Sequence, residues 1–106
     1  MKIIGWLVLA IIPAYFVACT GISASKSRAY ESIGFRDTRT AVIDAFGASD
    51  VVEVPGKPFL RYATRPCGAC AERLWFENGL TFGIEAWSVE LDREGRVLET
   101  AHWVSP

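Results

Sequence analysis

The chain has 106 residues, which is enough for one small domain but not for two. Apolar residues make up 51% of it, charged residues make up 22%, and the formal net charge is −1. These values exclude a disordered tail, a coiled coil and a strongly basic nucleic-acid-binding protein. The mean hydropathy of +0.23 overstates how hydrophobic the domain is, because much of the apolar content lies in residues 1–18.

The N-terminus has the pattern of an export signal. Lys2 supplies one positive charge, and residues 3–18 are uncharged and rich in Ile, Leu, Val and Ala. The run ends in Phe16-Val17-Ala18-Cys19, which resembles the lipobox of bacterial lipoproteins, where the peptide is cut before a cysteine that carries diacylglycerol. We therefore predict a lipoprotein signal peptide or membrane anchor over 1–18 and lipidation at Cys19, which would hold the chain on a bilayer.

Two alternatives stay open for this segment: an uncleaved membrane anchor and an ordinary secreted protein. The anchor fits because 23 uncharged residues lie between Lys2 and Lys26, which is long enough to span a bilayer. Ser, Thr and Gly in the last part of the run favour a flexible tether instead, which we predict over 19–31, with entry into a short helix around 25–33 as an option. Each alternative exports the domain, so we place it in the bacterial cell envelope with its globular part in the periplasm. The outer membrane is favoured, because Thr20 stands where lipoproteins held in the inner membrane carry Asp.

The three cysteines of the chain are Cys19, Cys67 and Cys70. An odd number in an exported protein leaves one thiol to explain, and lipidation of Cys19 explains it. In an oxidising compartment, Cys67 and Cys70 are then expected to form a disulfide that closes a very short loop. Thiol–disulfide exchange is an alternative for this pair, although a redox site typically lies at a helix N-terminus. A metal site would need two further ligands, and the chain has one histidine.

Residues 32–106 predict one α+β domain. A helix is expected over 37–46, with Asp37 or Thr38 as N-cap and Gly47 at its end. Alternating residues and turn signals then predict short strands. We expect one or two short helices packed on a three- to four-stranded antiparallel meander, after the N-terminal signal or anchor segment. The segments with strand character, from which the meander would be built, are residues 59–64, 72–77, 80–82, 87–92 and 96–104.

Side-chain alternation predicts which residues of the late strands point inward. Residues 87–92 alternate with Trp87, Val89 and Leu91 facing the core, and this register requires a bulge near 83–86. In the last strand, one face is expected to hold Val97, Ala101 and Trp103, and the other face Leu98 and Val104.

Two stretches of the domain carry short motifs. The expected helix and the residues after it carry Thr38-x-x-x-Val42-x-x-x-Phe46-Gly47-x-x-Asp50, and a late strand ending in Asp92 is followed by Gly95-Arg96-Val97. Together with the lipobox, these motifs resemble the SmpA/OmlA (BamE-like) family of small outer-membrane lipoproteins. The resemblance implies a two-helix, three-strand α+β lipoprotein without enzymatic activity. Some members of that family assist the insertion of outer-membrane β-barrels as accessory subunits, so the resemblance implies an envelope protein as partner.

The sequence offers no pattern typical of catalysis, of a cofactor or of a metal site. His102 lacks a nucleophile and an orienting acid in a recognisable setting, and the glutamates of the strands are expected on the solvated face. Aromatic and basic residues of the sheet region exceed what a small core needs, and any that are exposed would anchor a partner. The candidates for partner binding are Trp75, Trp87, Trp103, Arg61, Arg73 and Arg96.

The sequence therefore predicts a non-enzymatic envelope lipoprotein that binds another envelope protein, in outer-membrane assembly or maintenance. One alternative is a membrane-tethered thiol–disulfide protein that uses Cys67 and Cys70, and another is a small periplasmic binder or inhibitor. The expected partners are an envelope protein and the lipid bilayer, which the chain would reach through acylated Cys19. Nucleic acid is not an expected partner, and the sequence predicts no particular oligomeric state.

Overall fold

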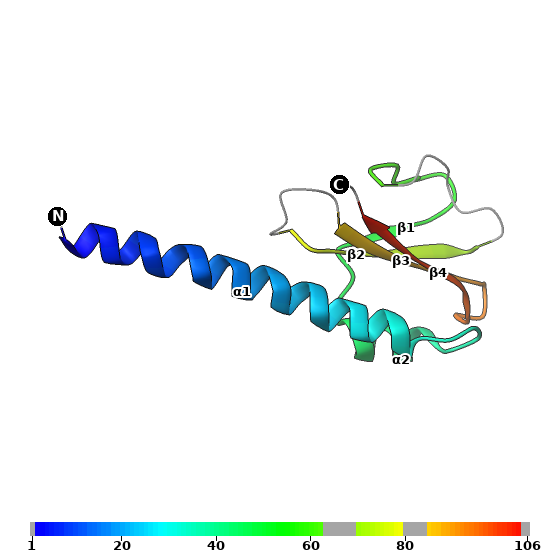
Figure 1. The fold of residues 1–106 in the computed structure, drawn as a ribbon. Helices are drawn as coiled ribbons and strands as arrows, with labels where there is room; N and C mark the ends of the chain where they lie inside the picture. The colour runs from blue at the N-terminus through cyan, green and yellow to red at the C-terminus, as the bar shows by residue number, and fades with distance from the viewer. Residues whose placement is uncertain (1, 63–69, 80–84, 105–106) are drawn as a thin grey trace.

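The computed structural model describes residues 2–62, 70–79 and 85–104, with side chains from residue 9 onward. Their strands form one antiparallel meander in the order β1-β2-β3-β4, and both helices lie on the same side of it (Figure 1). This is an α+β fold, as the sequence predicts. Its elements are α1 (Lys2–Ser32), α2 (Arg39–Phe46), β1 (Val51–Glu53), β2 (Glu72–Glu77), β3 (Glu85–Leu91) and β4 (Val97–Val104).

Helix α1 is one continuous helix of 31 residues. At 1.5 Å per residue it is about 46 Å long. Its first part projects beyond the sheet and its last part runs along the sheet (Figure 1). The described stretch Leu9–Ser32 is long and apolar enough to cross a membrane. The chain therefore begins with an apolar helix that is consistent with a signal or anchor segment.

The segment 19–31, which the sequence predicts to be a flexible tether, is helical in the structure. Serine and glycine favour helices weakly, but packing against the rest of the fold outweighs local propensity. Ala29 is buried in the core, and Tyr30 packs against it. The Lys26 ammonium donates a hydrogen bond to the Phe46 carbonyl at the end of α2. These contacts hold the second half of α1 against the domain.

Helix α2 lies where the sequence predicts a helix. The Thr38 side chain is the N-cap and accepts a hydrogen bond from the Ala41 N–H at 3.1 Å. Gly47 ends the helix with φ of 89°, a left-handed conformation that glycine adopts without strain. Val42 and Phe46 are buried, and the Phe46 ring stacks on Phe76 of β2 with centroids 4.3 Å apart. These two side chains fix α2 against the sheet.

The helix-facing side of the sheet carries the main core. Every second residue along β2 and along β3 points into this core, as expected for a sheet with one face packed on helices. Trp87, Val89 and Leu91 all point into this core and are fully buried, which confirms the predicted alternation of β3. The sheet residues of the core are Leu74, Phe76, Trp87, Val89, Leu91 and Val97.

One bulge divides the last strand between the two faces of the sheet. Leu91 pairs with Val97 and Glu90 pairs with Glu99, which leaves Leu98 as an extra residue on β4. Val97 therefore packs in the helix-facing core, whereas Ala101 and Trp103 lie on the opposite face. The prediction that Val97 shares a face with Ala101 and Trp103 is wrong, because one inserted residue reverses the alternation.

The remaining strand predictions divide into three cases. Strand β1 over 51–53 is not among the expected strands. Residues 59–62 of the expected strand 59–64 form no strand, and residues 63–64 lie outside the described residues. Strand 80–82 also lies outside them, and the described part of the expected bulge at 83–86 belongs to the regular ladder of β3.

The sheet face that points away from the helices, here called the outer face, holds a second apolar cluster. Trp75 and Ala86 are fully buried there. Phe59, Tyr62 and Trp103 pack against them, with ring centroids 5.3 to 5.9 Å from that of Trp75. The segment that contains Phe59 and Tyr62 thus covers the middle of the outer face, so the central strands are buried on both sides.

Candidate functional site: the Cys19 junction and the distal cleft

The predicted lipidation residue lies at the edge of the folded domain. Cys19 is half-buried, and its carbonyl oxygen accepts a hydrogen bond from the Asn78 side-chain amide at 3.2 Å. The same amide nitrogen lies 3.9 Å from the Cys19 sulfur. Because Asn78 directly follows β2, the thiol is placed next to the end of that strand rather than on a free tether.

One carboxylate joins α1 to the sheet beside Cys19. Glu85 at the start of β3 accepts hydrogen bonds from the Ser23 hydroxyl and from the Asn78 side chain, both at 3.0 Å. Its other contact is with His102 of β4, whose Nε2 lies 3.5 Å from the carboxylate. We call this cluster the Cys19 junction; it consists of Cys19, Ser23, Asn78, Glu85 and His102.

Three of the six predicted partner anchors lie inside the fold. Trp75 and Trp87 have no exposed surface, and Arg73 is 6% exposed. The expectation that they present contact surface to a partner is therefore corrected: each side chain fills one of the two faces of the central strands. The anchors with accessible surface are Arg61 and Arg96, which are exposed, and Trp103, which is half-buried.

Arg73 is buried because it is paired with a carboxylate from the neighbouring strand. Its guanidinium donates to both oxygens of Glu53, from Nε at 2.7 Å and from Nη2 at 3.0 Å. The Trp75 indole N–H donates to the same carboxylate at 2.9 Å, and the guanidinium lies over that ring at 5.0 Å. Two parallel hydrogen bonds and a third donor satisfy the charges that burial would otherwise leave uncompensated.

The pKa of the Glu53 carboxyl reflects this balance. Burial alone would raise that pKa, but hydrogen bonds from Arg73, Trp75 and the backbone of Phe59 lower it overall. The ionised form is therefore the native one. Sequence reasoning missed Glu53, although its place in the apolar run Val51-Val52-Glu53-Val54 was a sign that it is buried.

Two glutamates also lie side by side on the outer face. Glu90 is directly opposite Glu99 in the β3–β4 ladder. Burial, together with the hydrogen bond and the negative charge of Glu99, raises the pKa of Glu90. The two side chains thus share a proton more readily than isolated glutamates would.

Exposed Arg61 belongs to a small polar cluster at the edge of the outer face. Its guanidinium lies 3.4 Å from the Glu77 carboxylate and 5.4 Å from the centroid of the Tyr62 ring. Burial and the hydrogen bond with Glu77 raise the pKa of Tyr62 to about 12. The hydroxyl therefore stays protonated at neutral pH.

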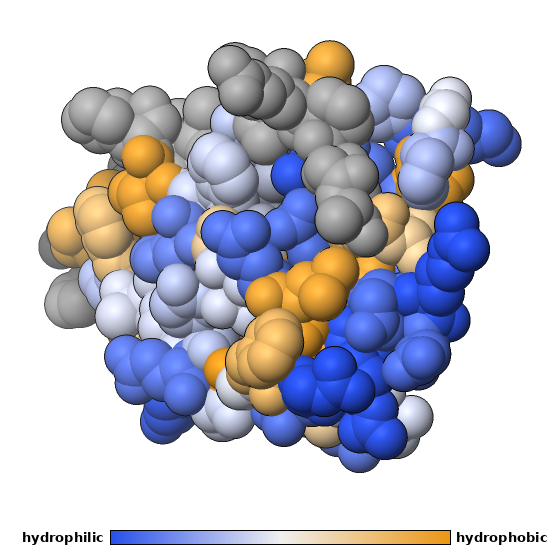
Figure 2. All heavy atoms as spheres, turned by 90° about the vertical axis from the view of Figure 1, so that its right-hand side faces the viewer, coloured by the Kyte–Doolittle hydropathy of each residue, from blue (hydrophilic) through white to orange (hydrophobic). Residues whose placement is uncertain are grey.

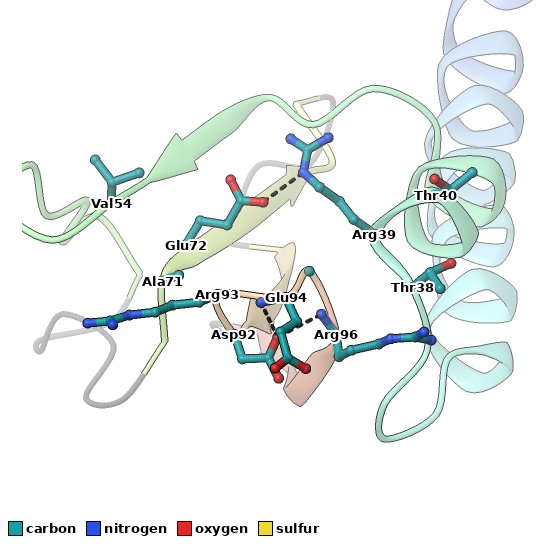
Figure 3. Close-up of a pocket in the computed structure, with 11 residues that line it drawn as sticks. Thr38, Arg39, Thr40, Val54, Ala71, Glu72, Asp92, Arg93, Glu94 and Arg96 are labelled. Atoms are coloured by element: carbon teal, nitrogen blue, oxygen red, sulfur yellow. Dashed lines mark hydrogen bonds and ion pairs between the residues drawn. The ribbon is translucent and has the colours of Figure 1, made fainter.

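A cleft of about 570 Å³, lined by charged side chains, lies between the start of α2, the start of β2 and the β3–β4 turn (Figure 3). We call it the distal cleft. Arg39 of α2 spans it and pairs with Glu72 of β2 at 2.7 Å. In Figure 3 the guanidinium groups of Arg93 and Arg96 extend from the turn in opposite directions. The lining residues are Thr38, Arg39, Thr40, Val54, Ala71, Glu72, Asp92, Arg93, Glu94, Gly95 and Arg96.

Hydrogen bonds to the Asp92 carboxylate and between backbone groups hold the β3–β4 turn, which forms one side of the distal cleft. The Asp92 carboxylate accepts from the N–H groups of Glu94 and Arg96 at 2.9 and 3.0 Å, which fixes the β3–β4 turn. The Arg39 N–H donates to the Gly95 carbonyl at 2.8 Å, which ties that turn to α2. Gly95 has φ of 75°, so the turn requires glycine there.

The predicted cysteine pair is placed only in part. Cys70 is buried just before β2, and Cys67 lies outside the described residues, so the Cys67–Cys70 disulfide stays a prediction. Among the residues that the structure describes, no three His, Cys, Asp or Glu side chains gather to hold a metal ion.

Comparison with protein families, curated proteins and solved structures found no match to this chain. The resemblance to the SmpA/OmlA lipoproteins therefore rests on the sequence motifs alone. The class that the structure itself defines is an α+β meander that carries a long apolar N-terminal helix.

Proposed function

We propose that the chain is a non-enzymatic envelope lipoprotein, attached to a bilayer through acylated Cys19, whose domain binds another envelope protein. One observation carries this proposal. Large apolar side chains of α1 before Cys19 are exposed, and the helix contacts the domain at Cys19 and at residues after it. The exposed residues are Leu9, Ile11, Ile12, Phe16 and Val17, each with 51% or more of its surface accessible.

Exposed apolar side chains of this size are unfavourable in water, at about 1.5 to 3 kcal/mol each. Two fates remove the cost: cleavage of the leader, or its insertion into the hydrocarbon core of a membrane. Insertion would put Cys19 at the membrane surface, and cleavage would do so once the Cys19 sulfur is acylated, since Cys19 itself contacts Asn78 of the domain. Acylation of the Cys19 sulfur would then hold the domain directly at the bilayer.

The properties of the distal cleft support a binding role over catalysis. The cleft is open to solvent and is lined mostly by charged and polar side chains. Small-molecule and catalytic sites are typically enclosed and mostly apolar, whereas the rim of a protein interface is polar and accessible. This contrast favours recognition of a macromolecule.

Metabolic labelling with an alkyne palmitate analogue in a Gram-negative host tests the attachment. We expect the wild-type chain to be labelled, and the Cys19→Ser variant to lose the label and to keep its leader. The matched control is the Cys67→Ser/Cys70→Ser double variant, which should be labelled like the wild type. A full-length, unlabelled wild-type chain in the membrane fraction would instead support the uncleaved anchor, and a chain in the cytosol would contradict both.

A further inference from the structure

We propose that the outer edge of β4 from Glu99 to Val104, here called the free edge, binds an extended segment of the partner protein as a further strand of the sheet, and that this segment carries a basic residue opposite Glu99. This inference rests on the proposed function and adds to it the surface and the mode of binding. Its supports are the unpaired backbone groups of the edge, the directions of its side chains, and an uncompensated carboxylate beside it.

Backbone groups of alternate residues point out of the sheet along the free edge. The Glu85 and Leu91 carbonyls accept hydrogen bonds from the residues that flank β2, so the residues of β3 that bond to β4 are those at the positions between. These residues are Ala86, Ser88 and Glu90, and their partners on β4 are Trp103, Ala101 and Glu99. The N–H and C=O groups of Thr100 and His102 therefore point away from β3, and no other described strand pairs with them.

Such a row of groups matches a polypeptide in an extended conformation. Donors and acceptors alternate along an edge strand, and an added strand presents the same alternation at a distance of about 4.8 Å. An ion, a lipid headgroup or a small molecule satisfies one group of the row rather than all of them. The occupant that fits the free edge is therefore an extended segment of protein.

The protein covers the beginning of β4 and leaves the rest of its edge uncovered by described residues. The Val97 N–H donates to the Asp37 carbonyl, and the Val97 carbonyl accepts from the Arg36 N–H, both at 2.8 Å. Figure 2 looks at this end of the domain, away from the N-terminus of α1, and hydrophilic residues cover most of the described surface there. The pairing stops at the bulge formed by Leu98. Sheets protect long edges with lysine or proline, and residues 99–104 contain neither.

The two aromatic rings of the free edge lean over β3 rather than across the edge. On the outer face, the Trp103 indole N–H donates to the Ser88 hydroxyl at 2.9 Å. On the helix-facing side, the His102 ring stacks on the Trp87 ring with centroids 4.9 Å apart. Neither ring therefore stands between β4 and an added strand.

A carboxylate beside the edge determines the charge that the segment should carry. The outer face near β4 holds the carboxyls of Glu53, Glu90 and Glu99 and the guanidinium of Arg73. Arg73 pairs with Glu53 at 2.7 Å and reaches Glu90 at 4.0 Å. Glu99 is exposed, and in the described part of the chain no ion pair joins it to a basic side chain. A lysine or arginine opposite Glu99 on an added strand would compensate this charge.

A second copy of this chain does not fit the free edge when both copies are anchored. Two β4 strands that pair symmetrically run antiparallel, about a two-fold axis. Cys19 contacts Asn78, whose side chain bonds to Glu85. Glu85 pairs with Val104, so Cys19 lies at the end of the sheet where β4 ends, and α1 projects from that end (Figure 1). The axis would place the two Cys19 residues at opposite ends of the joined sheet, which does not suit one bilayer. The segment therefore belongs to another protein.

Fluorescence anisotropy with the full chain in phosphatidylcholine nanodiscs tests the proposal. The probe is the labelled peptide acetyl-Thr-Val-Thr-Val-Thr-Lys-Thr-amide, which favours an extended conformation and has one basic residue. We expect this peptide to bind, and we expect the same peptide with N-methylated amides not to bind. A peptide with Glu in place of Lys should bind about fivefold more weakly, because like charges then face each other across the strands. Equal binding of the methylated and unmethylated peptides would overturn the proposal.

A proline on the free edge tests the position of the site. Thr100→Pro removes an N–H that points away from β3, which an edge strand tolerates, and should weaken binding about fivefold, the worth of one hydrogen bond. The control is Val52→Pro on β1, at the opposite edge of the sheet, which should bind the peptide like the wild type. Circular dichroism confirms that each variant is folded. Equal losses in the two variants would contradict docking at β4.

Amide hydrogen exchange, measured residue by residue by NMR, requires no variant. In the chain without peptide, the amides of Thr100 and His102 should exchange fast, and those of Ala101 and Trp103, which bond to β3, should exchange slowly. The peptide should slow the exchange of Thr100 and His102. Slow exchange of these two amides before the peptide is added, or unchanged exchange after it binds, would overturn the proposal.

Two further measurements separate the alternatives. Sedimentation of the full chain in detergent shows whether it forms dimers, and a dimer that Thr100→Pro abolishes would overturn the inference in favour of pairing between copies. Acyl labelling at Cys19 is measured on the same chains. A labelled chain that does not bind the peptide contradicts the free edge alone, whereas an unlabelled chain that binds it contradicts the proposed attachment alone.

Discussion

The Ser23 hydroxyl on α1 donates a hydrogen bond to the Glu85 carboxylate on β3, at 3.0 Å and across 62 positions of sequence. The same carboxylate accepts a hydrogen bond from Asn78 and lies close to His102. One side chain thus connects the apolar helix to the residue after β2 and to two strands. The direction in which α1 leaves the domain depends on this connection.

Replacing Glu85 should therefore loosen α1 from the sheet. Glu85→Ala leaves the Ser23 hydroxyl and the Asn78 amide without this acceptor, at a cost of about 1 to 3 kcal/mol in the free energy of unfolding. Urea unfolding gives that free energy, and amide hydrogen exchange should show faster exchange in residues 20–32. The control, Glu94→Ala on the exposed turn, should change stability by less than about 0.5 kcal/mol. Unchanged exchange in α1 of the Glu85→Ala variant would contradict this role.

The buried ion pair on the outer face should be far more sensitive than an exposed one. Arg73→Met leaves the Glu53 carboxylate buried without its main partner, which should cost about 3 to 5 kcal/mol in the free energy of unfolding. Arg39→Met breaks a pair at the same distance of 2.7 Å on the surface and should cost about 1 kcal/mol or less. Chemical denaturation of the two variants side by side measures both. A similar loss in the two would show that Glu53 is not desolvated.

The Glu90 carboxyl should make stability depend on pH. Burial and the neighbouring Glu99 raise the pKa of Glu90 above 4.5, so the folded chain keeps a proton that the unfolded chain releases. Its contribution to stability is fully present below pH 4.5 and is lost as pH rises through the raised pKa. Glu90→Gln, which has no proton to lose, should gain stability relative to the wild type as pH rises from 4.5 to neutral.

Unfolding free energies of both chains across that range test the sign. Glu53 acts in the opposite direction, since its lowered pKa stabilises the fold above pH 4.5 and the effect disappears as pH falls. Both chains contain Glu53, and because its negative charge also acts on Glu90, the comparison reports Glu90 together with this coupling. A difference that stays constant with pH would mean that Glu90 titrates normally.

Replacing both residues of the cysteine pair distinguishes a structural disulfide from a site of thiol–disulfide exchange. If Cys67 and Cys70 form a structural disulfide, the Cys67→Ser/Cys70→Ser variant should lose about 2 kcal/mol of stability, as the short loop predicts. Its acylation at Cys19 should be unchanged. Titration against glutathione buffers gives the reduction potential of the pair. A potential near that of oxidising disulfide exchangers would support the thiol–disulfide alternative.

The sequence predicted the elements that have local signals. It failed where one inserted residue sets the register of a strand, or where a distant partner determines whether a side chain is buried. The cap at Thr38 and the end at Gly47 defined α2, and alternation placed Trp87, Val89 and Leu91 in the core. The extra residue at Leu98 has no mark of its own in the sequence, yet it moves Ala101 and Trp103 to the opposite face. Register errors of this kind follow from a period of two.

The candidate sites were harder to predict because their geometry is long-range. Arg73 looked like an exposed anchor until Glu53, twenty positions earlier, was found to neutralise it. Residues 19–31 looked like a tether because they are rich in Ser, Ala and small polar residues, but Ser23, Lys26 and Ala29 contact the domain. The distal cleft is formed by segments that meet only in the fold, and of its arginines only Arg96 was singled out beforehand.

The contacts of α1 with the domain have a consequence if Cys19 is acylated as proposed. A domain on a flexible tether samples a large volume, whereas a domain packed beside its acylated residue would stay within a thin layer next to the lipid surface. Any molecule it engages must itself come down to that layer, most simply by residing in the same leaflet. Encounters are then two-dimensional searches, and a short-lived contact suffices where a freely diffusing protein would need a tight one.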